Sequence, residues 1–98
     1  MLVYKLLHAA EWAAFEADGD FAGSADDLRD GFIHLSAEDQ VDGTRAKYFA
    51  GAAGVVLVTL DAEALEPALR WEPSRGGALF PHLYRPLTRT DIAAVSGE

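Results

Sequence analysis

The sequence contains no cysteine among its 98 residues. Disulfide bonds, thiolate nucleophiles and zinc sites built on cysteine are therefore excluded. The sequence also lacks an apolar run of the roughly 18 to 20 residues that cross a bilayer, and it lacks a charged leader followed by an apolar stretch and a cleavage site. We therefore expect a cytoplasmic protein that has no contact with a membrane.

Basic residues are also scarce. Eight lysines and arginines stand against 16 acidic residues, which gives a net charge of −8. Attraction to phosphate dominates the binding of nucleic acids and anionic membranes, so this balance argues against both as partners. The exception is the segment 70–89, which carries four arginines and a single acid, Glu72. We interpret this basic segment as a binding region for a small anionic ligand; arginines that are solvated or paired with acidic neighbours are the alternative.

The length and the order of the elements predict one compact α+β domain over residues 1–98. Alternating and β-branched apolar residues predict strands over residues 2–7, 32–36, 55–60, 69–72, 79–84 and 92–95. Helix-forming and capping residues predict helices over residues 9–17, after Ser24, after Ser36 and from Asp61 to Leu65. The late strands are short and closely spaced, which leaves no room for the helical crossovers of a parallel sheet.

Two strands carry further expectations. The apolar run 55–60 is typical of a central strand that is covered on both faces. Pro81 cannot donate a backbone hydrogen bond, so we expect strand 79–84 to lie at a sheet edge or to contain a bulge.

The segment Trp71 to Tyr84 has the composition of a pocket wall, because large apolar side chains alternate with chemically reactive ones around Gly76 and Gly77. Glu72 lies between Trp71 and Pro73 and is the candidate carboxylate for acid–base catalysis or charge stabilisation. Tyr84 ends the segment with a second ring on which a ligand can stack.

Imidazole and guanidinium groups complete the candidate site. Arg75 is the candidate ligand for a phosphate or carboxylate, and His82 adds an imidazole to the basic segment. His34 and Ser36 share one face of their predicted strand, so both can bind the same ligand. A hydrogen-bonded histidine in the core is the alternative for His34.

Other familiar sites do not fit the spacing. His8, His34 and His82 form no paired ligand motif, so we predict no metal site. The serines lack the Gly-x-Ser-x-Gly setting of a nucleophile, and the Gly76-Gly77 pair belongs to neither a dinucleotide fingerprint nor a phosphate-binding loop.

Several motifs together resemble a bacterial family, the domain of unknown function 952 family. The two most specific are Gly31-Phe32-Ile33-His34-Leu35-Ser36 and Leu79-Phe80-Pro81-His82-Leu83-Tyr84. Four others follow in the order of that family, namely Tyr4-Lys5, Glu11-Trp12, Val56-Leu57-Val58 and Trp71-Glu72. The resemblance covers nearly the whole chain. It implies an ADP-ribosyltransferase-like fold, a split β-sandwich of two small sheets flanked by short helices.

A more distant resemblance is to the RNA 2′-phosphotransferases of the same superfamily. His34-Leu35-Ser36 matches the end of their His-x-His-Leu-Ser strand. Their first strand reads Tyr-His-Gly-Thr and contacts the nicotinamide end of NAD or its ADP-ribose equivalent. This chain has Tyr4-Lys5-Leu6-Leu7 there, so Lys5 takes the place of the histidine.

Three functions follow from these residues. The first is binding of a nucleotide or another phosphorylated or anionic metabolite without turnover, by Lys5, His34, Ser36, Trp71, Arg75, His82 and Tyr84. The second is ADP-ribosyl transfer with NAD or a phosphorylated relative, in which His34 contacts the ribose and Glu72 stabilises an oxocarbenium-like centre. The third is a protein-interaction domain that uses the segment Trp71 to Tyr84. The sequence does not distinguish a monomer from an oligomer.

Overall fold

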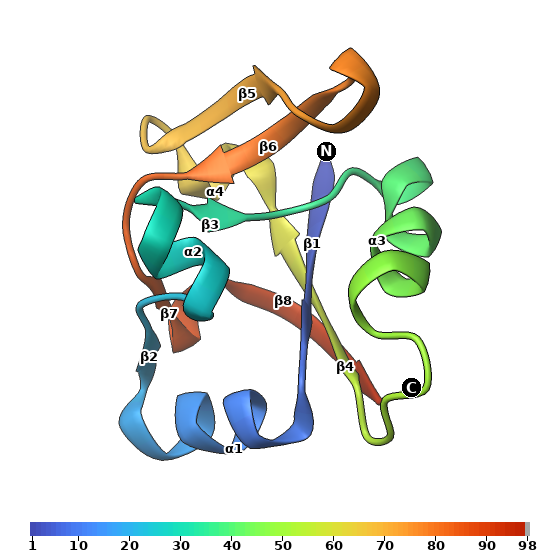
Figure 1. Cartoon of the computed structure of the whole chain (residues 1–98). Coiled ribbons are helices and arrows are strands. Elements are labelled where there is room, and N and C mark those ends of the chain that lie inside the picture. The colour runs from blue at the N-terminus through green and yellow to red at the C-terminus, as the bar shows by residue number, and fades with distance from the viewer. Residues whose placement is uncertain (98) are drawn as a thin grey trace.

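Two three-stranded antiparallel sheets frame the molecule (Figure 1). The structure is a computed structural model that describes residues 1–97 and the side chains of all of these except Arg75. The first sheet has the order β1-β4-β8, with strands Leu2–Leu7, Val56–Asp61 and Ile92–Gly97. The second has the order β3-β6-β5, with strands Ile33–His34, Leu79–Leu83 and Leu69–Pro73.

Short elements connect and cover these sheets. A two-stranded ladder joins β2 and β7, which are Asp20–Phe21 and Leu87–Thr88. The α-helices are α1 (Ala9–Asp18), α2 (Ala25–Asp30), α3 (Val41–Tyr48) and α4 (Ala62–Leu65). Single 3₁₀ turns lie at Glu38–Gln40, Arg75–Gly77 and Arg89–Asp91. Of the helices in residues 1–97, none has the length and apolar character needed to cross a membrane. The prediction of an α+β protein with small antiparallel sheets and short helices is confirmed.

Local sequence signals explain most helix ends. α1 ends because Gly19 adopts the left-handed conformation, with φ of 83°, and its N–H bonds to the carbonyl of Phe15. The N-terminus of α4 is capped as predicted, since Asp61 Oδ1 accepts a hydrogen bond of 3.1 Å from the Glu63 N–H.

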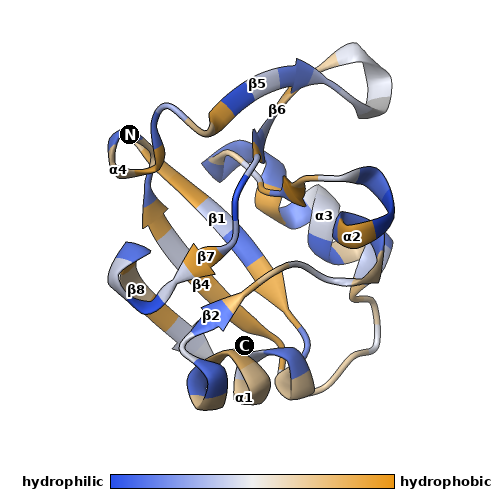
Figure 2. Ribbon diagram, turned by 90° about the vertical axis from the view of Figure 1, so that its left-hand side faces the viewer, coloured by the Kyte–Doolittle hydropathy of each residue, from blue (hydrophilic) through white to orange (hydrophobic). Residues whose placement is uncertain are grey.

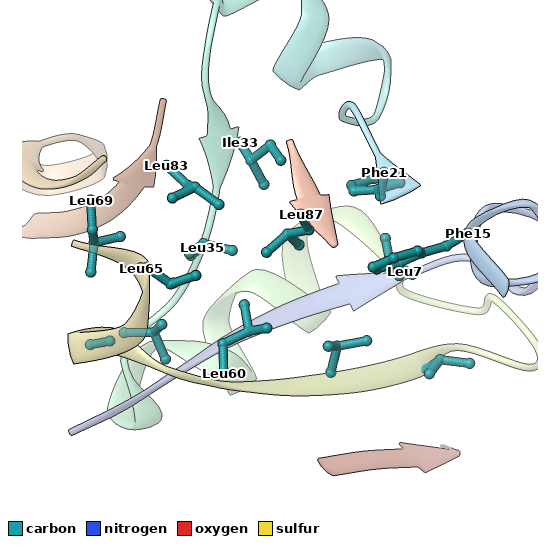
Figure 3. Close-up of a cluster of buried hydrophobic side chains, with 14 residues drawn as sticks. Leu7, Phe15, Phe21, Ile33, Leu35, Leu60, Leu65, Leu69, Leu83 and Leu87 are labelled. Carbon is teal, nitrogen blue, oxygen red and sulfur yellow. The ribbon is translucent and has the colours of Figure 1, made fainter. Parts of the chain in front are cut away.

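The main hydrophobic core lies between the two large sheets (Figure 3). Leu60 of β4, Leu65 of α4 and Leu83 of β6 are fully buried there. The colouring in Figure 2 shows the apolar residues of β1 and β4 side by side, as expected for paired strands with a buried face. A smaller cluster of Leu6, Val41 and Val55 packs on the other side of the first sheet.

A strand forms in each of the six predicted segments, but the segment 32–36 contributes only the two residues of β3, with Ser36 in an isolated bridge, and the setting of two other strands differs from the prediction. β4 is the central strand of its sheet, as expected, but only one face is fully covered, since Val58 is buried while Leu57 and Thr59 are half-buried. The expectation for Pro81 was wrong, because β6 is the central strand of its sheet. β3 pairs with β6 only opposite His82 and Leu83, so Pro81 lies just beyond that ladder and its missing N–H leaves no gap.

The prediction that Ser36 caps the next helix was also wrong. Ala37 occupies the N-cap position, and the Gln40 side chain accepts a hydrogen bond from its N–H at 2.9 Å. The Ser36 hydroxyl instead lies 3.0 Å from the hydroxyl of Thr44, on α3. Ser36 therefore does not cap a helix, and it lies in the wall of the cavity described below.

Replacing Leu83 by alanine is expected to lower the free energy of unfolding by about 2–5 kcal/mol, because truncation leaves a cavity in the core. Leu79→Ala is the matched control on the same strand, since 52% of Leu79 is exposed. Urea denaturation measures both variants, and the control should change by less than about 0.5 kcal/mol. Equal losses in the two variants would contradict the position of the core.

Candidate functional site

A cavity of about 410 Å³ opens where β1, β3 and β6 meet α2 and α3. Its wall combines hydroxyl groups, imidazoles and aromatic rings. Those that matter most for the chemistry are Tyr4, Lys5, Asp27, His34, Ser36, Thr44, Phe80 and His82. Small-molecule sites have volumes of about 300–1,000 Å³ and a few convergent polar groups, so this cavity has the size and chemistry of a binding site.

The carboxylate of Asp27 organises one wall of the cavity. Its side chain is 1% exposed and accepts hydrogen bonds from three elements. Lys5 Nζ of β1 lies 3.0 Å from Oδ2, the Ser24 N–H donates to Oδ2 at 2.9 Å, and the His34 N–H donates to Oδ1 at 3.1 Å. Lys5 Nζ also donates to the carbonyl of His34 at 3.0 Å. The ammonium group of Lys5 is thus paired with groups of the protein itself.

These contacts control the ionisation of Asp27. Burial raises the pKa of its carboxyl, but the hydrogen bond from His34, the ammonium of Lys5 and the backbone N–H groups lower it by more. The pKa of Asp27 therefore lies well below its ordinary value, and the group is a carboxylate at neutral pH.

The ring of His34 lies between two carboxylates. Its Nδ1 is 2.6 Å from Asp27 Oδ1, and its Nε2 is 3.0 Å from Asp30 Oδ2. These two contacts join β3 to both ends of α2.

Ser36 connects the first sheet to the second. Its N–H donates to the carbonyl of Tyr4 at 2.8 Å, and its carbonyl accepts from the N–H of Tyr4 at 2.8 Å. This isolated bridge holds the segment after β3 beside β1. The Ser36 side chain is buried at the cavity wall against Thr44.

His82 lies opposite His34 in the second sheet and is 4% exposed. Its Nδ1 is 2.8 Å from Glu72 Oε1, and the same oxygen accepts a hydrogen bond of 2.6 Å from the Tyr84 hydroxyl. Its Nε2 is buried and has no hydrogen-bond partner among the described residues. A buried polar atom without a partner costs about 1–3 kcal/mol, so this nitrogen is the one feature of the wall that packing does not account for.

Aromatic rings surround His82. The Phe32 ring stacks on it with centroids 4.0 Å apart, and Phe32 also contacts His34 and Tyr84 at centroid distances of 4.6 and 5.3 Å. The guanidinium carbon of Arg70 lies 5.3 Å from the centre of the Tyr84 ring. These contacts hold the His82 ring in one orientation.

The structure brings four of the predicted site residues to the cavity and leaves three away from it. Lys5, His34, Ser36 and His82 line the cavity. Glu72, Trp71 and Tyr84 are not among the lining residues: Glu72 and Tyr84 lie behind His82, and Trp71 packs against the main core. The side chain of Arg75 lies outside the described residues, although Ser74 beside it lines the cavity.

The arginines of the basic segment do not converge. Arg85 forms a two-point ion pair with Asp91, at 2.8 and 3.0 Å. Arg89 donates to the carbonyl of Glu16, and Arg70 lies over Tyr84. Three of the four arginines thus have structural partners. This agrees with the alternative interpretation of the basic segment, in which its arginines are solvated or paired within the protein.

Asp27 is the most important site residue that sequence reasoning missed. The Ser24-x-x-Asp27 capping box was a visible signal, but it predicts only the contact between Asp27 Oδ2 and the Ser24 N–H. Gly23 makes this contact feasible, since it has φ of 135° and a Cβ there would meet Asp27 Cβ at 2.6 Å. The reach of Lys5 and His34 to the same carboxylate depends on tertiary structure.

No group of three or more histidine, aspartate or glutamate side chains within the part of the chain that the structure describes is arranged to hold a metal ion. The fold and the cavity thus define a small α+β protein with a pocket, lined by both polar and apolar side chains, where its sheets meet α2 and α3. Residues 6–95 match the family model described as protein of unknown function (DUF952), so the chain belongs to that family.

Solved structures of a bacterial relative agree with this assignment. The crystal structure of protein CC0527 from Caulobacter crescentus is 54% identical, with a TM-score of 0.95 over 99% of this chain and 85% of that chain. The solution NMR structure of CC0527 is 55% identical, with a TM-score of 0.86 over 97% of this chain and 82% of that chain. A search of curated proteins found no match.

Asp27→Asn is expected to destabilise the protein by roughly 3–5 kcal/mol at neutral pH, because it leaves Lys5 and His34 without their buried counter-charge. A carboxyl whose pKa is lowered on folding stabilises the protein above its unfolded pKa, which is about 3.9. The difference between the original chain and the variant should therefore shrink as the pH falls below about 4. Urea denaturation across this pH range provides the test.

Asp26→Asn is the matched control, because 53% of the Asp26 side chain is exposed and its ion pair with Arg29 is at the surface. We expect a loss of no more than about 1 kcal/mol for this variant. A pH-independent difference for Asp27→Asn, or a loss no larger than in the control, would contradict the role of Asp27.

Proposed function

We propose that this protein binds a small metabolite with hydroxyl groups and an anionic group, such as a nucleotide, in the cavity beside Ser36 and His82. The observation that carries the proposal is the buried Nε2 of His82, which lacks a partner among the described residues and belongs to a residue of the cavity wall. Binding sites commonly present such a group, because the ligand supplies the missing hydrogen bond.

The chemistry of the wall supports a ligand rich in hydroxyl groups. Ser36 and Thr44 offer hydroxyls that both donate and accept, as a ribose requires. Phe49, Phe80 and Tyr48 offer flat apolar surface for a ring. This combination favours a polar ring compound over a purely aliphatic one.

The anionic group belongs at the mouth of the cavity rather than in its interior. Lys5 is the buried cation of the wall and is paired with Asp27, the exposed Arg29 is paired with Asp30, and further acids line the wall. Ser74 lies at the wall immediately before Arg75, the residue that the sequence marks as the candidate ligand for a phosphate or carboxylate. We therefore assign the anionic contact to Arg75.

A second candidate is ADP-ribosyl transfer on an ADP-ribosyltransferase-like fold. Two small sheets joined by the bridge between Tyr4 and Ser36 support it, because the resemblance places the nicotinamide end of NAD at the strand that carries Tyr4. Two contacts oppose it: Lys5 is held by Asp27, and Glu72 is held by His82 and Tyr84. Binding without turnover is therefore the stronger proposal. A protein-interaction role for the segment Trp71 to Tyr84 is weakened because Trp71 packs on the core.

Titration of the protein with ADP-ribose should shift the backbone amide resonances of Ser36, Thr44 and Ser74, and leave those of β8 unchanged. ADP-ribose is the probe because it contains ribose hydroxyls, a base and two phosphates. Two-dimensional NMR of the labelled chain provides the measurement. The proposal fails if millimolar ADP-ribose, NAD and inorganic phosphate all leave the spectrum unchanged.

Arg75→Ala should weaken the binding of ADP-ribose at least about tenfold, because a charge-assisted hydrogen bond is lost. Lys47→Ala is the matched control, since Lys47 carries the same charge but does not line the cavity. Adenosine, which has no phosphate, should bind both variants equally. An equal loss in the two variants would point to non-specific attraction instead.

Incubation with NAD distinguishes binding without turnover from ADP-ribosyl transfer. We expect no release of nicotinamide over hours, because the carboxylate of Glu72 is occupied by His82 and Tyr84. Chromatography of the reaction mixture measures the product. Release that disappears in Glu72→Gln would favour the transferase instead.

A further inference from the structure

The three groups Tyr84, Glu72 and His82 form a hydrogen-bonded chain that ends at the cavity wall. Tyr84 donates to Glu72 Oε1 at 2.6 Å, and His82 Nδ1 lies 2.8 Å from the same oxygen. These two donors lower the pKa of Glu72, so the group is an ionised carboxylate at neutral pH. An ionised carboxylate only accepts hydrogen bonds, and the proton of the neutral imidazole must therefore reside on Nδ1.

We infer that Glu72 fixes His82 as the Nδ1–H tautomer, so that Nε2 accepts a hydrogen bond from a hydroxyl group of the molecule bound in the cavity. This inference rests on the proposed function, because it names the group of the ligand that contacts the wall. Glu72 and Tyr84 are then positioning residues, and His82 is the residue that touches the ligand.

The surroundings of His82 select the kind of donor. Phe32 stacks on the ring and Nε2 is buried, so a slim group reaches it more easily than a bulky one. The His34 ring lies 5.6 Å away between centroids, and both of its nitrogens lie beside carboxylates. The Nε2 atom of His82 is therefore the imidazole nitrogen of this wall that has no partner among the described residues.

The same contact suits removal of the hydroxyl proton. The O–H bond would break with its electron pair left on oxygen, and the proton would form the Nε2–H bond. His82 would then be an imidazolium, and the carboxylate of Glu72 would balance its charge through the Nδ1–H bond.

The tautomer can be measured in the protein alone. NMR of histidine side-chain nitrogens at mildly alkaline pH should show the proton of His82 on Nδ1. Glu72→Leu should abolish this preference, whereas Tyr84→Phe should keep it, because Glu72 still accepts from Nδ1. Glu72 is suitable for substitution because 35% of its side chain is exposed. A proton on Nε2 in the original chain would overturn the inference.

Titration with ADP-ribose tests the second part of the inference, which is the hydrogen bond between the ligand and His82 Nε2. The His82 ring nitrogens should shift together with the Ser36 amide, and Glu72→Leu should weaken binding at least fivefold relative to Tyr84→Phe. Shifts at Ser36 with none at His82 would overturn the inference and leave the proposed function standing. If no resonance shifts, the proposed function fails and the contact between the ligand and His82 fails with it, whereas the tautomer measurement still shows whether Glu72 positions the ring.

Discussion

The ion pair between Lys5 and Asp27 is the contact on which the rest of the site depends. Asp27 is buried at the N-terminal end of α2, and it is the only acidic residue of the described chain that is fully buried. Burial of a single charge is costly, so the carboxylate is stable there only because Lys5, His34 and Ser24 all donate to it. These three donors belong to β1, β3 and the start of α2, and the carboxylate therefore sets the relative positions of all three elements.

The second histidine is held in a different way. Both ring nitrogens of His34 lie beside carboxylates, whereas His82 has one nitrogen beside a carboxylate and one without a described partner. The two rings come from paired positions on neighbouring strands, so the sheet itself places the two imidazoles side by side. A hydroxyl group is complementary to His82 Nε2, because it supplies a neutral donor to an acceptor nitrogen.

The strands and most helix ends could be predicted because they depend on local sequence. The β-branched run of β4, the glycine after α1 and the cap at Asp61 each act within a few residues. β2 and β7 were missed, because each has only two residues and pairs with a partner far away in the chain. The setting of Pro81 was predicted wrongly because it depends on where β3 ends, and β3 is far from Pro81 in the sequence. β3 stops pairing before Pro81, so the missing N–H of Pro81 leaves no gap in the ladder.

The candidate site was predictable in part for the same reason. His34 and Ser36 were found as neighbours on one strand, His82 was found as an imidazole within the basic segment, and Lys5 was found through the resemblance to a known superfamily. Asp27 and Phe32 were not found, since their importance comes from contacts across the fold. The basic segment looked like one anion site along the sequence, but Arg85 and Arg89 bind groups on different elements. Arginines that are close together in the sequence therefore need not lie at one site in the folded protein.

The most direct test is a crystal structure of the chain soaked with ADP-ribose. The account predicts density for the ligand in the cavity, with a hydroxyl oxygen about 3 Å from His82 Nε2 and a phosphate beside Arg75. Clear density for ADP-ribose at another surface, or an ordered water on Nε2 with an otherwise empty cavity at saturating ligand, would contradict it.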